Sequence, residues 1–381
     1  EGDGGQLGTG PELESKYRPF PIMTDVPCVQ VAAGGMHSVA LAKSGAVYTC
    51  GVNDDGALGR ETDDDGSTEA QIVEGAIKGL KMVAVTAGDS HSLCMTAEGA
   101  VYGWGTFRDD NGVFAFTLDS KHENLPVLLL EANEADRAVK ICSGSHSAVV
   151  LTRSGKVITW GYGGQGQLGR VGKRISQRSR KVTYLTPTPV RLPRDAGKAV
   201  DVFTAEMGFF VLTDKDKVYV CGLNNWGQLG LEPDEDEPCV YAPTLCPDLS
   251  GKKLKCIKSG QHHSIALSAD GTVYCFGATT YGRLGIDLTE DQQEWAPVSK
   301  VTENFEGKVT DIACGVAATA AICNGRVYTW GSGVCKLHGM GDNEDDYEKP
   351  HMMKETKRFN GQIVTDMSMG GQHVMIVAKS S

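Results

Sequence analysis

The sequence predicts an all-β fold, a seven-bladed β-propeller with repeats of about 55 residues and a seventh blade split across the two termini. The prediction depends on three motifs that recur with one period, which is the signature of a repeat architecture. A strand of the form G-x-V-Y-x-x-G ends at Gly51, Gly105, Gly161, Gly222, Gly277 and Gly331. A G-x-L-G turn recurs at Gly8, Gly59, Gly169, Gly230 and Gly285, with decayed copies near Gly112 and Gly339. A glycine followed by a histidine opens a second strand at His37, His91, His263 and His373.

Each repeat contains only β signals, enough for about four short strands. A lone four-stranded sheet leaves its faces exposed to water, whereas sheets stacked around an axis cover one another. Dividing 381 residues by about 55 gives seven blades in a single domain, residues 1–381. The chain begins with a turn ending at Gly8 and ends with a strand over 373–378. The strand that should connect them is expected upstream of Glu1, unless another segment replaces it.

Composition limits the possible classes of protein. The 48 glycines suit many tight turns, and no segment is apolar for the length that crosses a bilayer. The net charge is −11, with acidic runs at 63–65, 234–237 and 342–346. Single runs are typical of solvated loops, but loops on one propeller face converge, so together they are expected to attract a basic partner. The charge argues against a general nucleic-acid binder, and no membrane partner is expected.

The twelve cysteines do not indicate a disulfide framework. Six of them fall inside apolar strand patterns, which is typical of buried free thiols in a reducing compartment: Cys50, Cys94, Cys142, Cys221, Cys275 and Cys323. No C-x-x-C pair and no Cys/His spacing indicates zinc.

A residue shared by most repeats is expected to hold the blade together, whereas one that breaks the repeat is a candidate for function. In the first two repeats, Asp3 lies in a turn, and Asp89 stands where other copies carry Gly35 or Gln261. Asp89 is therefore an exception to the pattern.

The recurring histidines would lie around a ring, one to a blade. We interpret them as structural imidazoles hydrogen-bonded to the backbone near the central channel, most clearly for His91 and His263. His146 comes one residue early in its copy of the motif, and His262 precedes the ring histidine, which makes it the better functional candidate of that pair. No metal and no cofactor are expected.

The repeat departs furthest from its pattern at residues 107–114, which read F-R-D-D-N-G-V-F where other blades have a tight turn. The Asp110-Asn111-Gly112 sequence between two apolar arms predicts a β-hairpin. A hairpin here would project from the propeller face. A decayed turn without a role is the alternative, but Arg108 among carboxylates favours a contact element.

A second exception lengthens one repeat to 61 residues. Residues 170–181 form a basic, polar insertion in an acidic protein. A charge run is usually a solvated loop, yet six basic side chains segregated in this way predict an acidic target, either protein or phosphate. These side chains are Arg170, Lys173, Arg174, Arg178, Arg180 and Lys181.

In order, the segments GGMHS, GDSHS, FRDDNGV, GQGQLGR, SGQHHS, YGRLG and MGGQH resemble the regulator of chromosome condensation family over the whole chain. The resemblance implies a nuclear, chromatin-associated exchange factor that performs no covalent chemistry. It would stabilise the nucleotide-free form of the GTPase Ran and promote GDP release and GTP loading. Roles in the cell cycle, nucleocytoplasmic transport and the mitotic spindle would follow.

The resemblance also implies site residues. It places a wedge that presses on the phosphate-binding loop of Ran at 107–113. Ran-facing residues would be Asp3, His37, Asp89, Arg108, Asp109, Asp110, Asn111, His146, Arg170, His262 and His373. The loop that grips the histone acidic patch of the nucleosome would correspond to Lys173, Arg174, Arg178, Arg180 and Lys181. DNA contacts are expected mainly from a basic N-terminal tail that is not part of this sequence.

His146 departs from the family, which has an aspartate there. Because an imidazole cannot replace a carboxylate that faces a basic partner, exchange efficiency is expected to suffer unless the alignment shifts or the partner has co-adapted.

Three alternatives come from other classes of protein. A propeller of this fold can be a non-catalytic interaction scaffold, although the unique hairpin argues against it. A light-sensing propeller needs clustered tryptophans, whereas the five here are spread one to a repeat. A hydrolytic propeller needs converging acid and base residues, which the sequence does not indicate.

Overall fold

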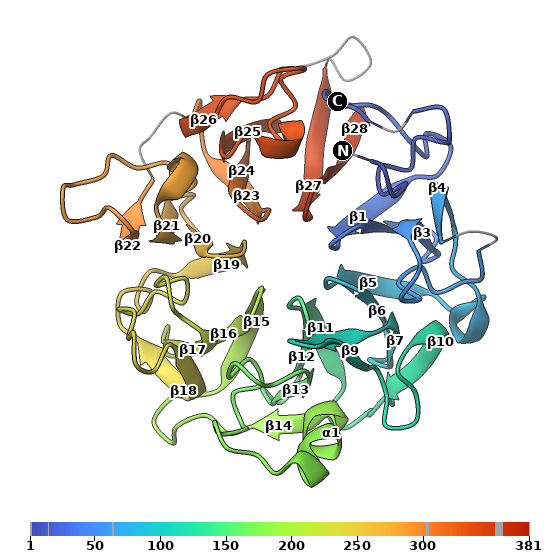
Figure 1. Ribbon diagram of the computed structural model, residues 1–381, viewed down its shortest axis with the longest axis vertical. Coiled ribbons are helices and arrows are strands. Elements are labelled where there is room, and N and C mark those ends of the chain that lie inside the picture. Colours follow the sequence, from blue (N-terminus) through green and yellow to red (C-terminus); the bar gives the residue numbers. More distant parts are fainter. Residues whose placement is uncertain (1, 14, 63–64, 302–304, 355–360, 381) are drawn as a thin grey trace.

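Short sheets are arranged in a ring around a central channel (Figure 1). The computed structural model describes residues 2–13, 15–62, 65–301, 305–354 and 361–380. Asp63 and Asp64 of the first acidic run lie outside these residues.

Six sheets have four antiparallel strands each, and we number them as blades 1 to 6 in chain order. Blade 1 contains β1 (Cys28–Ala33), β2 (His37–Ala42), β3 (Val47–Val52) and β4 (Gly66–Ile72). Blade 2 contains β5 (Met82–Ala87), β6 (His91–Thr96), β7 (Val101–Gly105) and β10 (Glu123–Leu130). Blade 3 contains β11 (Ala138–Ser143), β12 (Ser147–Thr152), β13 (Val157–Gly161) and β14 (Thr188–Val190).

The other three blades repeat this plan. Blade 4 contains β15 (Ala199–Ala205), β16 (Gly208–Thr213), β17 (Val218–Leu223) and β18 (Cys239–Cys246). Blade 5 contains β19 (Leu254–Ser259), β20 (His263–Ser268), β21 (Val273–Ala278) and β22 (Trp295–Lys300). Blade 6 contains β23 (Val309–Cys314), β24 (Ala318–Cys323), β25 (Arg326–Gly331) and β26 (Tyr347–Met352).

Two further sheets have two strands each. One is a hairpin of β8 (Phe107–Asp109) and β9 (Gly112–Ala115), and the other pairs β27 (Gln362–Met369) with β28 (Val374–Ser380). The helical segments are α1 (Gln177–Leu185) and three short 3₁₀ turns, η1 (Gly75–Ile77), η2 (Thr280–Gly282) and η3 (Val334–Lys336). None of the helices in the described ranges is long and apolar enough to cross a bilayer.

The all-β propeller predicted from the sequence is confirmed, but the described residues form six four-stranded blades rather than the seven blades expected, of which the seventh was to be split across the termini. The seventh place in the ring, between β23 and β1, is occupied by the two-stranded sheet β27–β28 (Figure 1). Within the described residues, β28 pairs with β27 alone. The reason is visible in the sequence, since no G-x-V-Y-x-x-G strand follows the strand that contains His373.

The interior explains why the second strand of most blades is a continuous apolar run. Neighbouring blades cover both faces of this strand, so alternation of polar and apolar residues is lost. Strands β2, β6, β12, β20 and β24 are buried at all six positions. One core cluster joins Val39 and Leu41 of blade 1 to Cys94 and Trp104 of blade 2, so the core lies between blades rather than inside one.

The glycine that ends each third strand is required by the backbone. At Gly51 φ is +116°, and a Cβ atom there would lie 2.4 Å from the carbonyl oxygen of Met36 in the adjacent strand turn. A side chain would therefore both strain the backbone and collide with it.

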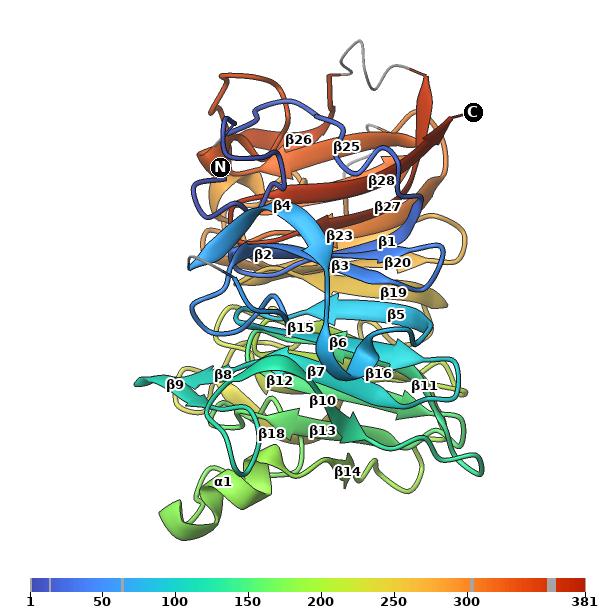
Figure 2. The same ribbon diagram turned by 90° about the vertical axis from the view of Figure 1, so that its right-hand side faces the viewer.

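The two sides of the ring carry different turns, because antiparallel strands reverse at each turn. The turns between the first and second strands lie on one side, and those between the second and third strands lie on the other. The hairpin β8–β9 and helix α1 both project from the first side (Figure 2). We call this side the hairpin face.

Candidate functional site

The hairpin β8–β9 is formed within the stretch 107–114 that the sequence singles out. Its strands pair from Phe107 opposite Ala115 to Asp109 opposite Gly112. The backbone N–H of Asn111 donates to Asp109 Oδ1 at 2.8 Å, which stabilises the turn. The tip stands clear of the ring on the hairpin face (Figure 2), so it is available to another molecule.

The base of the hairpin belongs to the core. Phe107 is fully buried and stacks on Phe116 with ring centres 5.1 Å apart. The His91 ring lies 4.7 Å from the Phe107 ring. The hairpin is therefore a projection with an anchored root rather than a decayed loop.

Arg108 on the hairpin is held by the neighbouring blade. Its Nε atom donates to Asp55 Oδ2 at 2.9 Å, and Nη2 contacts the same oxygen. This hydrogen bond raises the pKa of Arg108, and Asp89 raises it further. Arg108 thus connects the hairpin of blade 2 to blade 1, and a partner that binds Arg108 would have to compete with Asp55.

Acidic groups gather at the mouth of the channel on this face. Backbone hydrogen bonds join equivalent turns, from Gly35 N to Asp89 O, from Asp89 N to Ser145 O and from Ser145 N to Glu206 O. Ser145 therefore lies between Asp89 and Glu206 in this row of turns, and the two carboxylates still interact. Burial and the Asp89 carboxylate raise the pKa of Glu206 to about 7.

The sequence analysis missed Glu206, although a signal was present. Glu206 occupies the repeat position that holds Gly35 and Asp89 in other blades, so it breaks the repeat as Asp89 does. His146 lies in the same region, where burial lowers its pKa while Asp89 opposes that effect. Arg108 lowers the pKa of His146 as well, so the imidazole lies between opposing charges.

The ring histidines lie inside the protein rather than on its face. His37 and His373 are each 1% exposed, and burial lowers their pKa values to about 4 and about 3. His37 Nε2 lies 2.9 Å from Ser92 Oγ, and that hydroxyl donates to the carbonyl of Ala57. The imidazole therefore donates to a hydroxyl of the next blade, which relays the bond to a turn.

The same relay recurs around the ring. His373 Nε2 lies 2.9 Å from Ser38 Oγ, and His263 Nε2 lies 2.8 Å from Thr319 Oγ1. Nε2 of these histidines thus has a hydroxyl of the next blade as its partner, which was not expected, and backbone groups also act on His37 and His373 as predicted. His37 and His373 are therefore buried beneath the hairpin face, where they connect neighbouring blades instead of contacting a partner.

The remaining expected contact residues are dispersed. Arg170 donates to the carbonyls of Thr159, Thr183 and Thr186. These bonds tie the basic insertion to blade 3, and burial lowers the pKa of Arg170 to about 10. Asp3 is exposed in the first turn.

His262 is half-buried at a blade–blade junction. Its ring lies 5.9 Å from the ring of Trp226. Burial and the nearby Arg283 lower its pKa.

The basic insertion differs from the loop that the charge run indicated, because residues 177–185 form helix α1. Several of its cations are used within the protein. Lys173 pairs with Glu237 at 3.2 Å, Arg180 with Asp109 at 3.0 Å, and Lys181 Nζ donates to the carbonyl of Leu118. Arg174 and Arg178 are exposed.

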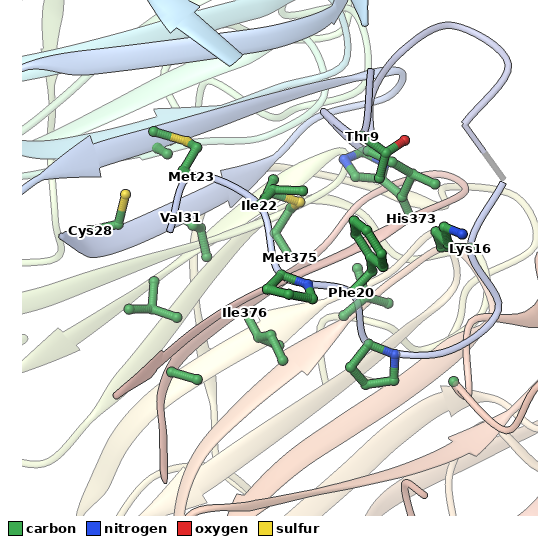
Figure 3. Close-up of a pocket in the computed structure, with 18 of the residues that line it drawn as sticks. Thr9, Lys16, Phe20, Ile22, Met23, Cys28, Val31, His373, Met375 and Ile376 are labelled. Atoms are coloured by element: carbon green, nitrogen blue, oxygen red, sulfur yellow. The ribbon is translucent and has the colours of Figure 1, made fainter. Parts of the chain in front are cut away.

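A cavity of about 720 Å³ lies beside β28, and His373 is among the residues that line it (Figure 3). Its lining is mostly apolar and includes Phe20, Ile22, Val31, Met375 and Ile376. The central channel has a volume of about 410 Å³. In the described part of the chain no three His, Cys, Asp or Glu residues are grouped as metal ligands, and the twelve cysteines, all described, are free thiols.

Comparison with known proteins places this architecture in a family. The model of the RCC1-like domain matches residues 1–376. The regulator of chromosome condensation of Xenopus laevis is 35% identical over 393 residues, an alignment that covers 100% of this chain and 89% of the relative. The guanine nucleotide exchange factor SRM1 of Saccharomyces cerevisiae is 30% identical, with 96% and 83% covered.

The fold agrees with a solved relative. The crystal structure of Prp20p from Saccharomyces cerevisiae superposes with a TM-score of 0.89 at 29% identity, covering 100% of this chain and 90% of Prp20p. That structure is described together with the binding of Prp20p to Gsp1p and histones. The full-length match in sequence and in fold shows that this chain belongs to the RCC1-like domain family.

Proposed function

We propose that the protein is a guanine nucleotide exchange factor for Ran, which stabilises nucleotide-free Ran and promotes GDP release and GTP loading. The names of its relatives support this function. The observation that carries it is the hairpin β8–β9, a rigidly rooted projection found once in a ring of repeats.

Exchange of this kind breaks no covalent bond. It requires that the protein bind the empty GTPase more tightly than the loaded form, because a ligand shifts an equilibrium only by its differential affinity. The tip of the hairpin, around Asp110 and Asn111, can occupy space near the nucleotide that the GTPase binds. Asp3, Asp89 and Glu206 supply negative charge for a basic surface.

We further propose association with chromatin in the nucleus through the exposed side of α1. Arg178 lies on the helix and Lys173 and Arg174 lie in the segment before it; all three are exposed, and they suit a histone acidic patch. The relative Prp20p is described with histone binding, which supports the class of partner.

The seventh place in the ring is proposed to be a blade whose outer strands pair with the outer edge of β28. The position of β27–β28 between blades 6 and 1 supports this, as does the apolar cavity beside β28 (Figure 3). An extended segment laid along that edge would cover both the unpaired strand and the cavity.

The experiment that tests the function measures release of labelled GDP from Ran with and without the protein. Acceleration in proportion to protein concentration is expected. Binding of Ran without acceleration would instead indicate the alternative, a non-catalytic interaction scaffold. Retention on immobilised nucleosomes, compared with a variant carrying Arg174→Glu and Arg178→Glu, tests the chromatin surface.

A further inference from the structure

Arg180 of α1 contacts the hairpin although 71 residues separate it from its partner. Its Nη2 atom lies 3.0 Å from Asp109 Oδ2, and the two side chains are only 20% and 10% exposed. A pair shielded from water in this way interacts more strongly than a surface ion pair. The contact therefore connects the two features that interrupt the repeat.

Three aromatic rings surround the same guanidinium. Its carbon lies 5.2 Å from the ring centre of Phe114, 5.4 Å from that of Tyr162 and 5.6 Å from that of Tyr184. The rings meet one another edge to face, with centres 5.8 to 6.0 Å apart. Phe114 belongs to the hairpin, Tyr162 follows β13 of blade 3 and Tyr184 belongs to α1, so Arg180 fills the junction of three elements.

Two more bonds fix the hairpin from the same side. The Tyr162 hydroxyl donates to Asp110 Oδ2 at 3.1 Å. Lys181 Nζ donates to the carbonyl of Leu118, in the loop that follows β9, at 2.8 Å. A hairpin with strands of three and four residues has little stability of its own, so these contacts decide where its tip points.

We propose that Arg180 is a positioning residue for nucleotide exchange, which holds the hairpin β8–β9 at the angle to the ring at which its tip meets the GTPase. This inference rests on the proposed function. It also separates Arg180 from the exposed cations of the basic insertion, since a guanidinium enclosed by Asp109 and three rings cannot also bind an acidic partner. One side of helix α1 then holds the hairpin in place, and its exposed side is the proposed docking surface for chromatin.

The first test is steady-state GDP release from Ran by the full chain and by Arg180→Ala. The variant is expected to lower kcat about tenfold, because a tenfold change in rate corresponds to the free energy that one hydrogen bond to a charged group contributes. KM should change by less than about twofold, because a misplaced hairpin loses an interaction made during release rather than initial binding. Arg180→Lys keeps the charge but not the planar fork, and it should recover only part of kcat.

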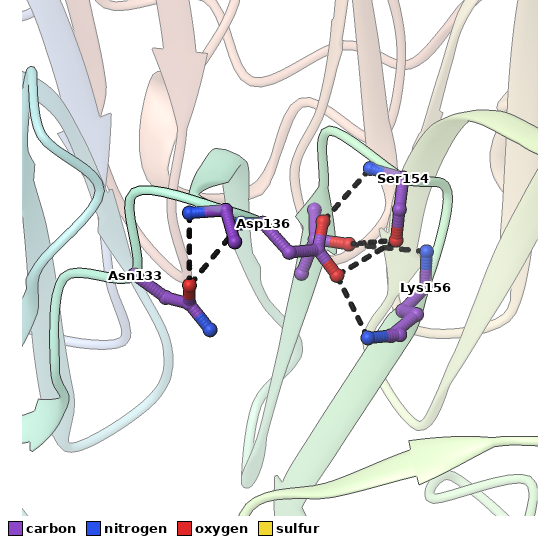
Figure 4. Close-up of polar contacts among 6 residues, drawn as sticks. Asn133, Asp136, Ser154 and Lys156 are labelled. Atoms are coloured by element: carbon purple, nitrogen blue, oxygen red, sulfur yellow. Dashed lines mark hydrogen bonds and ion pairs between the residues drawn. The ribbon is translucent and has the colours of Figure 1, made fainter.

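Lys156→Ala is the matched control. Lys156 Nζ forms a 2.9 Å ion pair with Asp136 in the same blade, where the Asp136 carboxylate also accepts from Ser154 (Figure 4). This cluster lies at the turn between β12 and β13, on the side of the ring opposite the hairpin face. Loss of that ion pair should leave kcat and KM unchanged.

The second test measures amide hydrogen exchange of residues 108–113 in the free protein, without Ran. Arg180→Ala should speed their exchange about tenfold, and Tyr162→Phe should speed it less, whereas Lys156→Ala should not. Should Arg180→Ala fail to fold, Arg180→Lys and Tyr162→Phe decide by the same measurements.

Wild-type kinetics together with wild-type hairpin protection in the variants would overturn the inference while leaving the exchange function intact. A wild-type protein that does not accelerate GDP release, but whose hairpin loosens in the variants, would overturn the proposed function alone.

Discussion

Single residues that break the repeat determine the charge of the hairpin face. Asp89 and Glu206 occupy one repeat position in blades 2 and 4, and Ser145 of blade 3 lies between them with backbone bonds to both turns. Burial and the Asp89 carboxylate both disfavour ionisation of Glu206, so the folded state bears the cost of this proximity. A surface of this kind is expected to attract a basic partner at the expense of stability.

Glu206→Gln tests how much stability this proximity costs. The pKa of Glu206 is raised to about 7 in the folded protein, above its usual value in an unfolded chain, so the folded state binds more protons between about pH 4.5 and pH 7. Stability contributed by the neutral acid is therefore lost as pH rises through this window. At pH 8 the substitution should raise the free energy of unfolding by about 3 kcal/mol, and at pH 4 it should change little. Urea unfolding measures this, with exposed Glu98→Gln as the control; equal effects at both pH values would refute the assignment.

The ring histidines predict the opposite dependence. Burial lowers the pKa of His37 to about 4, so the unfolded chain binds more protons between pH 6.5 and pH 4, and stability falls as pH falls through that window. The loss from His37 alone is about 3 kcal/mol. Unfolding free energies measured from pH 7 to pH 4 should drop steeply, and His37→Asn should flatten part of the curve. A curve that His37→Asn leaves unchanged would contradict the buried neutral imidazole.

At the scale of the element, the hairpin has a functional tip and a structural root. Replacing residues 108–112 by a short Gly-Ser turn, with Phe107 retained, should reduce the acceleration of GDP release by about a hundredfold. Folding should persist, because the fully buried Phe107 ring stays in the core. The comparison variant also removes Phe107 and should lose about 3–5 kcal/mol of unfolding free energy. Stopped-flow release and thermal unfolding separate the two effects; a tip-replaced protein with normal release would exclude the hairpin from exchange.

The hairpin and the helix were not equally predictable. Asp110-Asn111-Gly112 is a strong local turn signal, so its hairpin was predicted from the sequence. Helix α1 was missed because residues 177–185 are polar and show no clear apolar stripe, with Val182 exposed. The Arg180–Asp109 pair lay beyond the sequence for another reason, since no periodic pattern links residues 71 positions apart.

At the scale of the whole molecule, the period predicted the ring, and the seventh place, expected as a blade split across the termini, holds a two-stranded sheet. The motif spacing fixes how many sheets surround the axis, whereas the strand count in the last sheet depends on which segments are present to pair. The two-stranded sheet β27–β28 lies between blades 6 and 1, and the N-terminal segment also contacts blade 6, where Gly341 N donates to the carbonyl of Tyr17 at 2.8 Å. The joint between β27–β28 and blade 1 depends on a few side-chain bonds, including Val31 N to Asp366 Oδ2 at 2.7 Å and Ala33 N to Ser368 Oγ at 3.0 Å.

Ser38→Ala tests how the ring is closed, and Ser92→Ala is its matched control. Ser38 Oγ donates to the carbonyl of Gln6 and receives His373 of the seventh sheet, whereas Ser92 Oγ makes the same two bonds to Ala57 and His37 between complete blades. Each substitution leaves a buried imidazole unpaired and should lower the free energy of unfolding by about 2 kcal/mol.

Their local effects should differ. A two-stranded sheet can open without disrupting a four-stranded one, so Ser38→Ala should speed hydrogen exchange of β27 and β28 while the rest of the ring keeps its protection. Ser92 connects blades 1 and 2, and unfolding of either four-stranded blade breaks three strand pairings. The effect of Ser92→Ala should therefore appear only in global unfolding. Identical exchange patterns in the two variants would mean that β27–β28 is as firmly bound as any blade, and the ring would then close without a weak joint.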